Sequence, residues 1–105
     1  GSLWTRVTDA AAFSARHGAA CAVINGKAWM IGGYGITPSG FDAHLNDVWT
    51  SSDGVTWNNL LPHDASAPDR FLPRQQAGMA EAGGGIFLIG GEDSSSISND
   101  IWTME

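Results

Sequence analysis

An internal repeat limits what this chain can fold into more than any other feature of its sequence. Over the first part of the repeat, matching residues stand 58 positions apart: Phe13 and Phe71, Arg16 and Arg74, Trp29 and Phe87, Ile31 and Ile89, and the pairs Gly32-Gly33 and Gly90-Gly91. Over the last part they stand 53 positions apart, as in Asn46-Asp47-Val48-Trp49 and Asn99-Asp100-Ile101-Trp102. We call residues matched in this way counterparts. A unit of about fifty residues, with length changes confined to loops, is typical of propeller-type repeats.

The composition favours short strands. The 105 residues include 14 glycines and five tryptophans, 43 % of the chain is hydrophobic, and no long helical pattern is present. A chain of this length forms one domain at most, so we predict a single all-β domain. Its one cysteine, Cys21, excludes an internal disulfide, and its place among small residues predicts an inert buried thiol.

The charge argues against two classes of partner. With five basic and eleven acidic residues the formal net charge is −6, whereas nucleic acids and anionic membrane surfaces attract basic patches. The longest apolar runs are far shorter than the roughly 18 residues of a membrane-spanning helix. We therefore expect a soluble protein with no nucleic-acid and no membrane partner.

Hydrophobic runs and turn signals predict the strands. Asn25-Gly26 is a hairpin signal, because both residues tolerate the positive φ of a tight turn, and Asp53-Gly54 is another. The run from Ala28 to Ile31 is apolar on both faces and must be covered on both sides. The predicted strands are residues 3–8, 17–24, 27–34, 47–52, 55–60, 75–82, 86–91 and 100–104, with residues 35–45 as a loop.

The repeat also carries the residues of a known family. Its signature comprises an arginine, an Asn-Gly-Lys turn, a Gly pair that ends a hydrophobic strand, and two tryptophans eight residues apart: here Arg16, Asn25 to Lys27, Gly32-Gly33, Trp49 and Trp57. The sequence resembles kelch-type β-propeller repeats of bacterial kelch-like proteins and of the central domain of galactose oxidase. Many such repeats have a histidine where Ala19 and Ala77 stand here. The resemblance implies four-stranded antiparallel blades, two blade equivalents per chain, in a radial arrangement.

Within this resemblance the chain divides into four parts. Residues 1–2 are expected to be a cloning remnant, residues 3–8 an outer strand, residues 16–61 a first kelch-like blade, and residues 74–105 three strands of a second. Two blades alone would leave one apolar face of each in water and a strand edge unpaired. We therefore expect copies to close into a ring head to tail, with residues 3–8, including Trp4, completing the second blade of a neighbouring copy. A homotrimer of six blades is favoured, and a homotetramer of eight is the second choice.

Most residues of the repeat are expected to be structural. We predict no catalytic residue, metal or cofactor. Asp47 and Asp100 are expected to cap turns, and the tryptophans other than Trp29, which belongs to a sheet core, are expected to pack between blades. The structural signature consists of Gly32, Gly33, Asn46, Asp47, Trp49, Trp57, Gly90, Gly91, Asn99, Asp100 and Trp102.

Three residues are candidates for ligand contacts in the central channel of such a ring: Arg16, His17 and Arg74. Arginines that open the innermost strands could bind an anionic ligand there, although holding the carbonyl groups of a neighbouring loop is the preferred interpretation. His17 would recur around the axis and could offer several imidazoles to a metal. No second-shell partner for it is evident in the sequence.

The sequence therefore predicts a non-enzymatic, self-assembling kelch-like propeller fragment, engineered or excised, whose loops could bind a protein or glycan. The alternative is a ligand- or glycan-binding or enzymatic propeller with a site in the channel, resembling sialic-acid mutarotases or copper oxidases. An oxidase of that kind needs a linked Cys-Tyr pair and a second tyrosine, whereas this chain has only Cys21 and Tyr34, on different strands. A bacterial parent, cytoplasmic or exported, fits the resemblance.

Overall fold

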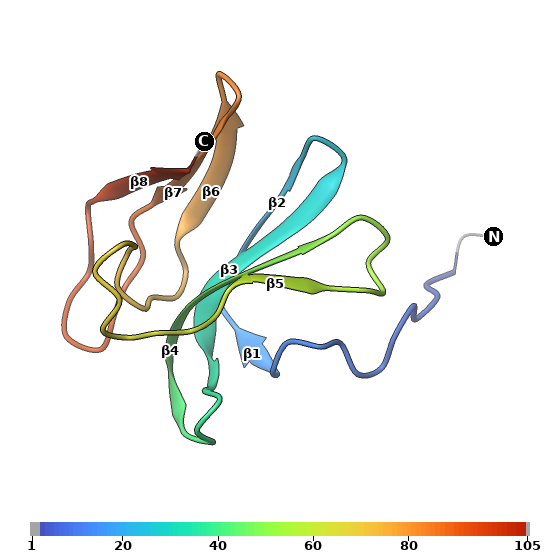
Figure 1. Ribbon diagram of the computed structural model, residues 1–105, viewed down its shortest axis with the longest axis horizontal. Coiled ribbons are helices and arrows are strands. Elements are labelled where there is room, and N and C mark those ends of the chain that lie inside the picture. Colours follow the sequence, from blue (N-terminus) through green and yellow to red (C-terminus); the bar gives the residue numbers. More distant parts are fainter. Residues whose placement is uncertain (1–2, 105) are drawn as a thin grey trace.

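Eight strands make up the described part of the chain (Figure 1). The structure is a computed structural model that describes residues 3–104, and among these residues it contains no helix. No helix there could therefore span a membrane. The prediction of an all-β fold is confirmed. The strands are β1 (Arg16–His17), β2 (Ala20–Ile24), β3 (Lys27–Ile36), β4 (Asp42–Ser51), β5 (Asn58–Leu61), β6 (Gly78–Ala82), β7 (Gly85–Ile89) and β8 (Ile101–Met104).

The strands form two antiparallel sheets that lie side by side. The first sheet contains β1, β3, β4 and β5 in that order, with β2 also paired to β3, and the second contains β6, β7 and β8. Strands β2 and β6 are neighbours where the two sheets meet, as Figure 1 shows. Gly18 has a positive φ of 72° between β1 and β2. This backbone interrupts the single strand that was predicted for residues 17–24.

The hairpin of β3 and β4 is longer than the sequence predicted. Most of residues 35–45, predicted as a loop, continue the two strands, with Gly35 opposite Ala43 and Ile36 opposite Asp42. The ladder shifts register between Ile31 and Gly33, where two glycines have positive φ values, so the strands pass through a bulge and pair again. The Gly, Pro and Ser residues of this segment predict one long loop, but only residues 37–41 form the tip of the hairpin.

Of the two predicted tight turns, the first has the geometry that its residues predict and the second is a longer loop. Asn25 and Gly26 have φ values of 53° and 77°, as a two-residue hairpin turn between β2 and β3 requires. At the second turn the carboxylate of Asp53 accepts bonds of 2.9 Å from the backbone N–H groups of Val55 and Thr56. These bonds hold the pKa of Asp53 below its ordinary value. The backbone N–H groups of Val55 and Thr56, predicted to begin a strand, are thus bonded within the loop, and β5 begins only at Asn58.

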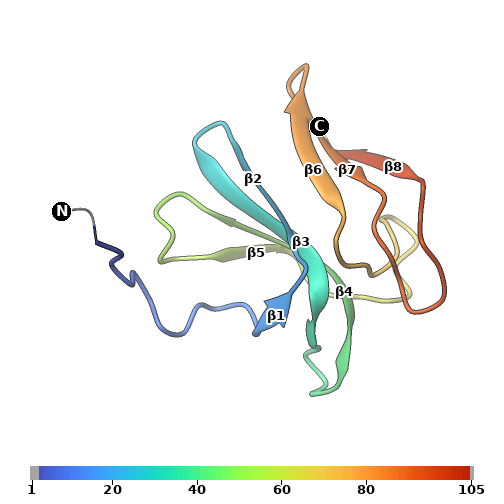
Figure 2. The same cartoon turned by 180° about the vertical axis from the view of Figure 1, so that it is seen from behind.

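The segment before β1 forms no strand within the described residues. Residues 3–8 were predicted as an outer strand, but they lead away from the first sheet, as seen from behind in Figure 2. Trp4 is fully exposed, at 103 % of its reference area, and no sheet lies against it in the described chain. The expected cloning remnant, residues 1–2, and the final residue of the second predicted blade, 105, lie outside the described residues.

The hydrophobic core lies between the two sheets. Met30 and Ile31 are neighbours on β3 and each is only 6 % exposed, so this strand is buried on both faces, as its sequence predicted. Phe71, from the connection between the sheets, fills the space between them and is 7 % exposed. The core consists of Ala20, Ile31, Val48, Phe71 and Leu88, with Trp29, Leu61, Ala77 and Met79 packed against it.

Candidate functional site

A set of backbone hydrogen bonds joins the two repeats, and we call this contact the inner joint. The N–H of Gly33 donates to the carbonyl of Arg74 at 2.8 Å, and the N–H of Arg74 donates to the carbonyl of Leu45 at 3.0 Å. Two residues after Arg74, the N–H of Gln76 donates to the carbonyl of Gly18 at 2.6 Å. The inner joint thus seats residues 71–76, which lead into the second sheet, against the Gly pair of the first repeat.

Asn46 fixes the connection that precedes these residues. Its amide nitrogen donates to the carbonyls of Asp64 and Phe71 at 2.8 and 3.2 Å, and its amide oxygen accepts from the N–H of Asp64 at 2.9 Å. Its backbone N–H donates to Nδ1 of His63 at 3.3 Å. With 1 % exposure, Asn46 is among the most buried residues of the chain. A polar group this deeply buried needs such partners, and no pattern in the sequence indicates which residues supply them.

Two further residues of this connection have electrostatic roles that the sequence reasoning missed. Burial of His63 lowers the pKa of its imidazole, because the charged form is less well solvated there. Arg70 donates to the carbonyl of Pro62 and so closes the loop on itself. Both lie in the stretch that is five residues longer than in the first repeat. That insertion was the only signal that could have drawn attention to them.

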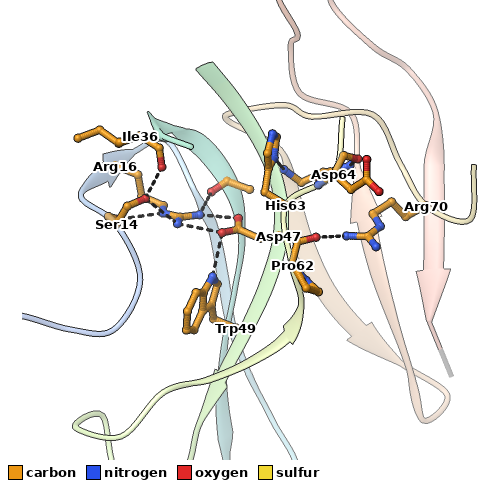
Figure 3. A network of polar contacts seen from close by, with 11 residues as sticks. Ser14, Arg16, Ile36, Asp47, Trp49, Pro62, His63, Asp64 and Arg70 are labelled. Atoms are coloured by element: carbon orange, nitrogen blue, oxygen red, sulfur yellow. Dashed lines mark hydrogen bonds and ion pairs between the residues drawn. The ribbon is translucent and has the colours of Figure 1, made fainter. Parts of the chain in front are cut away.

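A buried ion pair joins Arg16 of β1 to Asp47 of β4 (Figure 3). Arg16 donates to both oxygens of Asp47 at 2.6 and 3.0 Å, and Trp49 donates its indole N–H to the same carboxylate at 2.9 Å. The guanidinium also donates to the carbonyls of Ser14 and Gly32. The side chains of Arg16 and Asp47 are 4 % and 7 % exposed.

The second repeat contains the same arrangement. Arg74 donates to both oxygens of Asp100 at 2.6 and 3.0 Å, Trp102 donates to that carboxylate at 2.8 Å, and Arg74 also reaches the carbonyls of Leu72 and Gly90. The hydrogen bond from Arg74 is the main reason that the pKa of Asp100 falls to about 2.

These two arrangements revise the predicted roles. Both arginines donate hydrogen bonds to carbonyl groups, which was the preferred interpretation of their role, but these carbonyls belong to the arginine's own repeat and not to a neighbouring loop. The stronger acceptor of each arginine is an aspartate. Asp47 and Asp100 were predicted to cap turns, which is wrong: their carboxylates accept from a guanidinium and an indole. The sequence showed the two residue types at matching places but not that β1 and β4 bring them together.

His17 lies beside two other rings on the first sheet. Tyr34 of β3 stands between His17 of β1 and His44 of β4, with ring centres 5.6 and 5.0 Å away. An open cavity of about 670 Å³ adjoins this row, and its wall includes Tyr34, His44, Asp42 and Asp93. Among residues 3–104 no three side chains of His, Cys, Asp or Glu are grouped so that they could hold a metal ion.

The tryptophans differ in how well they are covered. Phe13 packs edge-on against Trp49 and Trp57, at 6.0 and 5.1 Å between ring centres. Trp102 lies 6.5 Å from Phe71 and remains 38 % exposed. Trp29 packs against the core, as predicted.

Cys21 is exposed, which corrects the prediction of a buried thiol. Alternate residues of β2 face opposite sides, so Ala20 and Ile24 are buried while Cys21 and Val23 are not. The face that carries Cys21 is turned away from the second sheet. Partial burial nevertheless raises the pKa of the thiol.

Among known proteins, the chain resembles solved structures only. No family model and no curated protein matches the chain. Among solved structures, the chain is similar to the structure of YjhT, with 25 % sequence identity and a TM-score of 0.59. The similarity covers 74 % of this chain and 21 % of that chain, so this chain spans about a fifth of the length of YjhT. The likeness therefore concerns one part of a longer chain of known structure.

Proposed function

We propose that this protein is a non-enzymatic repeat module that assembles head to tail with copies of itself into a closed ring of kelch-like propeller blades. The observation that carries the proposal is a difference in solvent exposure between counterpart residues of the two sheets. The first sheet packs on the second through Ala20, Ile31 and Val48, which are 4 %, 6 % and 1 % exposed. Ile89 and Ile101, the counterparts of Ile31 and Val48, are 45 % and 64 % exposed. The second sheet thus offers to solvent the face by which the first sheet packs on its neighbour.

The opposite face of the chain supports the same assembly. Met79 packs against the core from the second sheet, and its counterpart is the exposed Cys21. Val23, on the same face of β2, is 75 % exposed. A second copy that placed its second sheet against this face would cover Cys21 in the way that the first sheet covers Met79. Because the two complementary faces are different surfaces, the contact is head to tail, and identical contacts of this kind close into rings or continue as filaments.

The outer edge of the second sheet supports a strand exchange. In the first sheet, β4 pairs with β5 on its outer side, with Thr50 opposite Asn58 and Trp49 opposite Asn59. Within residues 3–104, β8 has β7 as its only partner. The counterparts of β5 are residues 5–8, directly after Trp4. In the proposed ring, residues 5–8 of one copy pair with β8 of the next, and Trp4 takes the place that Trp57 has beside the first sheet.

The number of copies follows from the family resemblance. Whole chains with two blade equivalents give even numbers of blades, and propellers typically have about four to eight. We favour a trimer with six blades over a tetramer with eight, because six-bladed propellers are common among kelch-like proteins. The proposal includes no cofactor and no catalytic residue.

The first test is the native mass of the protein in solution, by light scattering on a size-exclusion column and by native mass spectrometry. We expect three copies per particle, or four in the second case. Trp4→Ala should weaken assembly, whereas the control His17→Ala, a change of an exposed side chain that takes no part in the exchanged outer strand, should leave the mass unchanged. A monomer at all concentrations, or equal and small effects of both variants, would contradict the proposal.

A further inference from the structure

The inner joint has an unfilled counterpart at the end of the second repeat. Arg74 is held in the inner joint by bonds to Gly33 and Leu45. The counterparts of those two residues are Gly91 and Ser98. Among residues 3–104 no backbone hydrogen bond joins either of them to Arg16, the counterpart of Arg74. One set of donors and acceptors is therefore used inside the chain, and the matching set is not.

Asn99 shows the same contrast in its side chain. Its counterpart Asn46 makes three side-chain hydrogen bonds and is 1 % exposed. Asn99 is exposed, and its amide has no hydrogen bond to any group within residues 3–104. The residue that holds the connection after the first repeat is thus present in the second repeat, where residues 3–104 supply no such partner for it.

The space around the Gly pairs differs in the same way. A methyl group added at Gly32 would stand 2.8 Å from the carbonyl oxygen of Arg74 and 2.9 Å from that of Leu45. At Gly90 the only atom of the described chain within 4 Å would be the carbonyl oxygen of Ser98, at 3.2 Å. The place that Arg74 occupies beside Gly32 is therefore open beside Gly90.

A segment of this chain already has the shape to fill that place. In residues 71–76 the Arg74 guanidinium lies 5.7 Å from the centre of the Phe71 ring, and in residues 13–18 the Arg16 guanidinium lies 5.7 Å from that of Phe13. Each arginine also donates from Nε to the carbonyl two residues before it, at 3.1 Å. Residues 13–18 are thus held in the conformation that docks in the inner joint, and such preorganisation lowers the entropic cost of binding.

We propose that Gly90, Gly91, Ser98 and Asn99 form a receptor for residues 13–18 of a second copy of this chain. The inference rests on the proposed head-to-tail assembly and adds to it a contact that is separate from the exchanged outer strand. In the receptor, Gly91 N–H donates to the carbonyl of the incoming Arg16, whose own N–H donates to the carbonyl of Ser98. The amide nitrogen of Asn99 donates to the carbonyl of the incoming Phe13.

In the receptor, Asn99 has a counterpart for only one of the partners of Asn46. Asn46 also bonds to Asp64, but Asp64 belongs to the stretch that is five residues longer in the second repeat. Phe13 lies where the 58-residue spacing holds, so its carbonyl is assigned by direct match with Phe71. We therefore expect the amide of Asn99 to supply a single donor to the receptor, and its loss should weaken the contact between copies.

The test compares full-length Asn99→Ala and Asn99→Asp with the unchanged protein. Because Asn99 is exposed in the single chain, both variants should fold with unchanged circular dichroism. Dissociation is followed by light scattering and sedimentation over a dilution series. Loss of the donor should weaken each contact about tenfold, the effect of one buried polar group left without its partner. Because all contacts of a closed ring weaken together, the concentration at which half of the assembly dissociates should rise by at least that factor. Asn99→Asp, which keeps the shape but cannot donate, should weaken assembly at least as much as Asn99→Ala.

The result separates this inference from the assembly itself. If the unchanged protein forms a ring and both Asn99 variants dissociate at the same concentration as it does, the receptor is wrong while head-to-tail assembly stands. If the unchanged protein is monomeric throughout the series, the assembly fails and the receptor with it. Asn46→Ala serves as the matched control, because it should destabilise each chain as measured by thermal unfolding, which Asn99→Ala should not.

Discussion

Asp47 and Asp100 accept the same pair of bonds from an arginine, yet only Asp47 is buried. The bond lengths are 2.6 and 3.0 Å in both cases, whereas the side chains are 7 % and 42 % exposed. The difference follows from the connection that begins at Pro62 and His63, which passes near Asp47 in Figure 3. Within residues 3–104 no segment covers Asp100 in the same way, so the same ion pair exists in two solvent environments.

The two aspartates should therefore respond differently to substitution. Asp47→Asn leaves the buried Arg16 guanidinium without its counter-charge, and we expect it to lower the free energy of unfolding by about 3–5 kcal/mol. Asp100→Asn should cost clearly less, because water at this half-exposed site compensates part of the lost charge. Urea denaturation at a concentration where the chain is monomeric measures both. Equal losses would show that the difference in burial has no energetic consequence.

The ion pair of the second repeat should contribute to acid sensitivity. The pKa of Asp100 is about 2 in the folded chain, below its ordinary value of 3.8. Folding thus favours the charged form, so this contribution to stability is present above about pH 4 and is lost as the pH falls toward 2. Thermal unfolding between pH 5 and pH 2 should show a shallower decline for Asp100→Asn than for the unchanged protein. The control Asp9→Asn, at an exposed aspartate, should decline as the unchanged protein does.

His63 should affect the stability of the fold in a higher pH range than Asp100 does. Burial lowers the pKa of its imidazole below 6.5, so the unfolded chain takes up the proton more readily than the folded one. Stability should therefore be fully present above about pH 6.5 and decrease as the pH falls below that value. A titration of His63 by NMR together with thermal unfolding checks this expectation. A pKa above 6.5 in the folded chain would reverse the predicted sign.

Close approach of backbones should make Gly32 harder to replace than Gly26. Both have positive φ values, 66° and 77°, so alanine is strained at either position. At Gly32 the added methyl group would also meet the carbonyls of Arg74 and Leu45, whereas at Gly26 nothing lies within 4 Å. We expect Gly32→Ala to lower the melting temperature well below that of Gly26→Ala. Similar melting temperatures would mean that the inner joint adapts without loss.

Thiol labelling gives an independent view of the proposed assembly. Cys21 is exposed in the single chain, and it lies on the face that a second copy would cover. A thiol reagent should modify it readily in dilute, monomeric protein and many times more slowly in the ring. Equal labelling rates in particles of different mass would place the contact between copies on another face.

Composition, turn residues and apolar runs predicted the all-β fold, the turn at Asn25-Gly26 and the strand buried on both faces. The repeat also selected Asn46 and Asp47, but not the groups that they bond, because these partners depend on how β1 and the connection between the sheets are placed. Cys21 was predicted wrongly for a related reason. Its burial depends on what covers the outer face of β2, and a strand's own residues do not contain that information.

The long β3–β4 hairpin has a practical consequence. Its tip, residues 37–41, stands apart from the inner joint and from the two ion pairs, while the loop after Gly90-Gly91 is five residues shorter. Natural length variation at this place indicates that the fold tolerates insertions there at a small entropic cost. A peptide epitope grafted between Pro38 and Gly40 would be displayed once per chain, and in the proposed ring the hairpin tip would therefore be a suitable position for a multivalent tag.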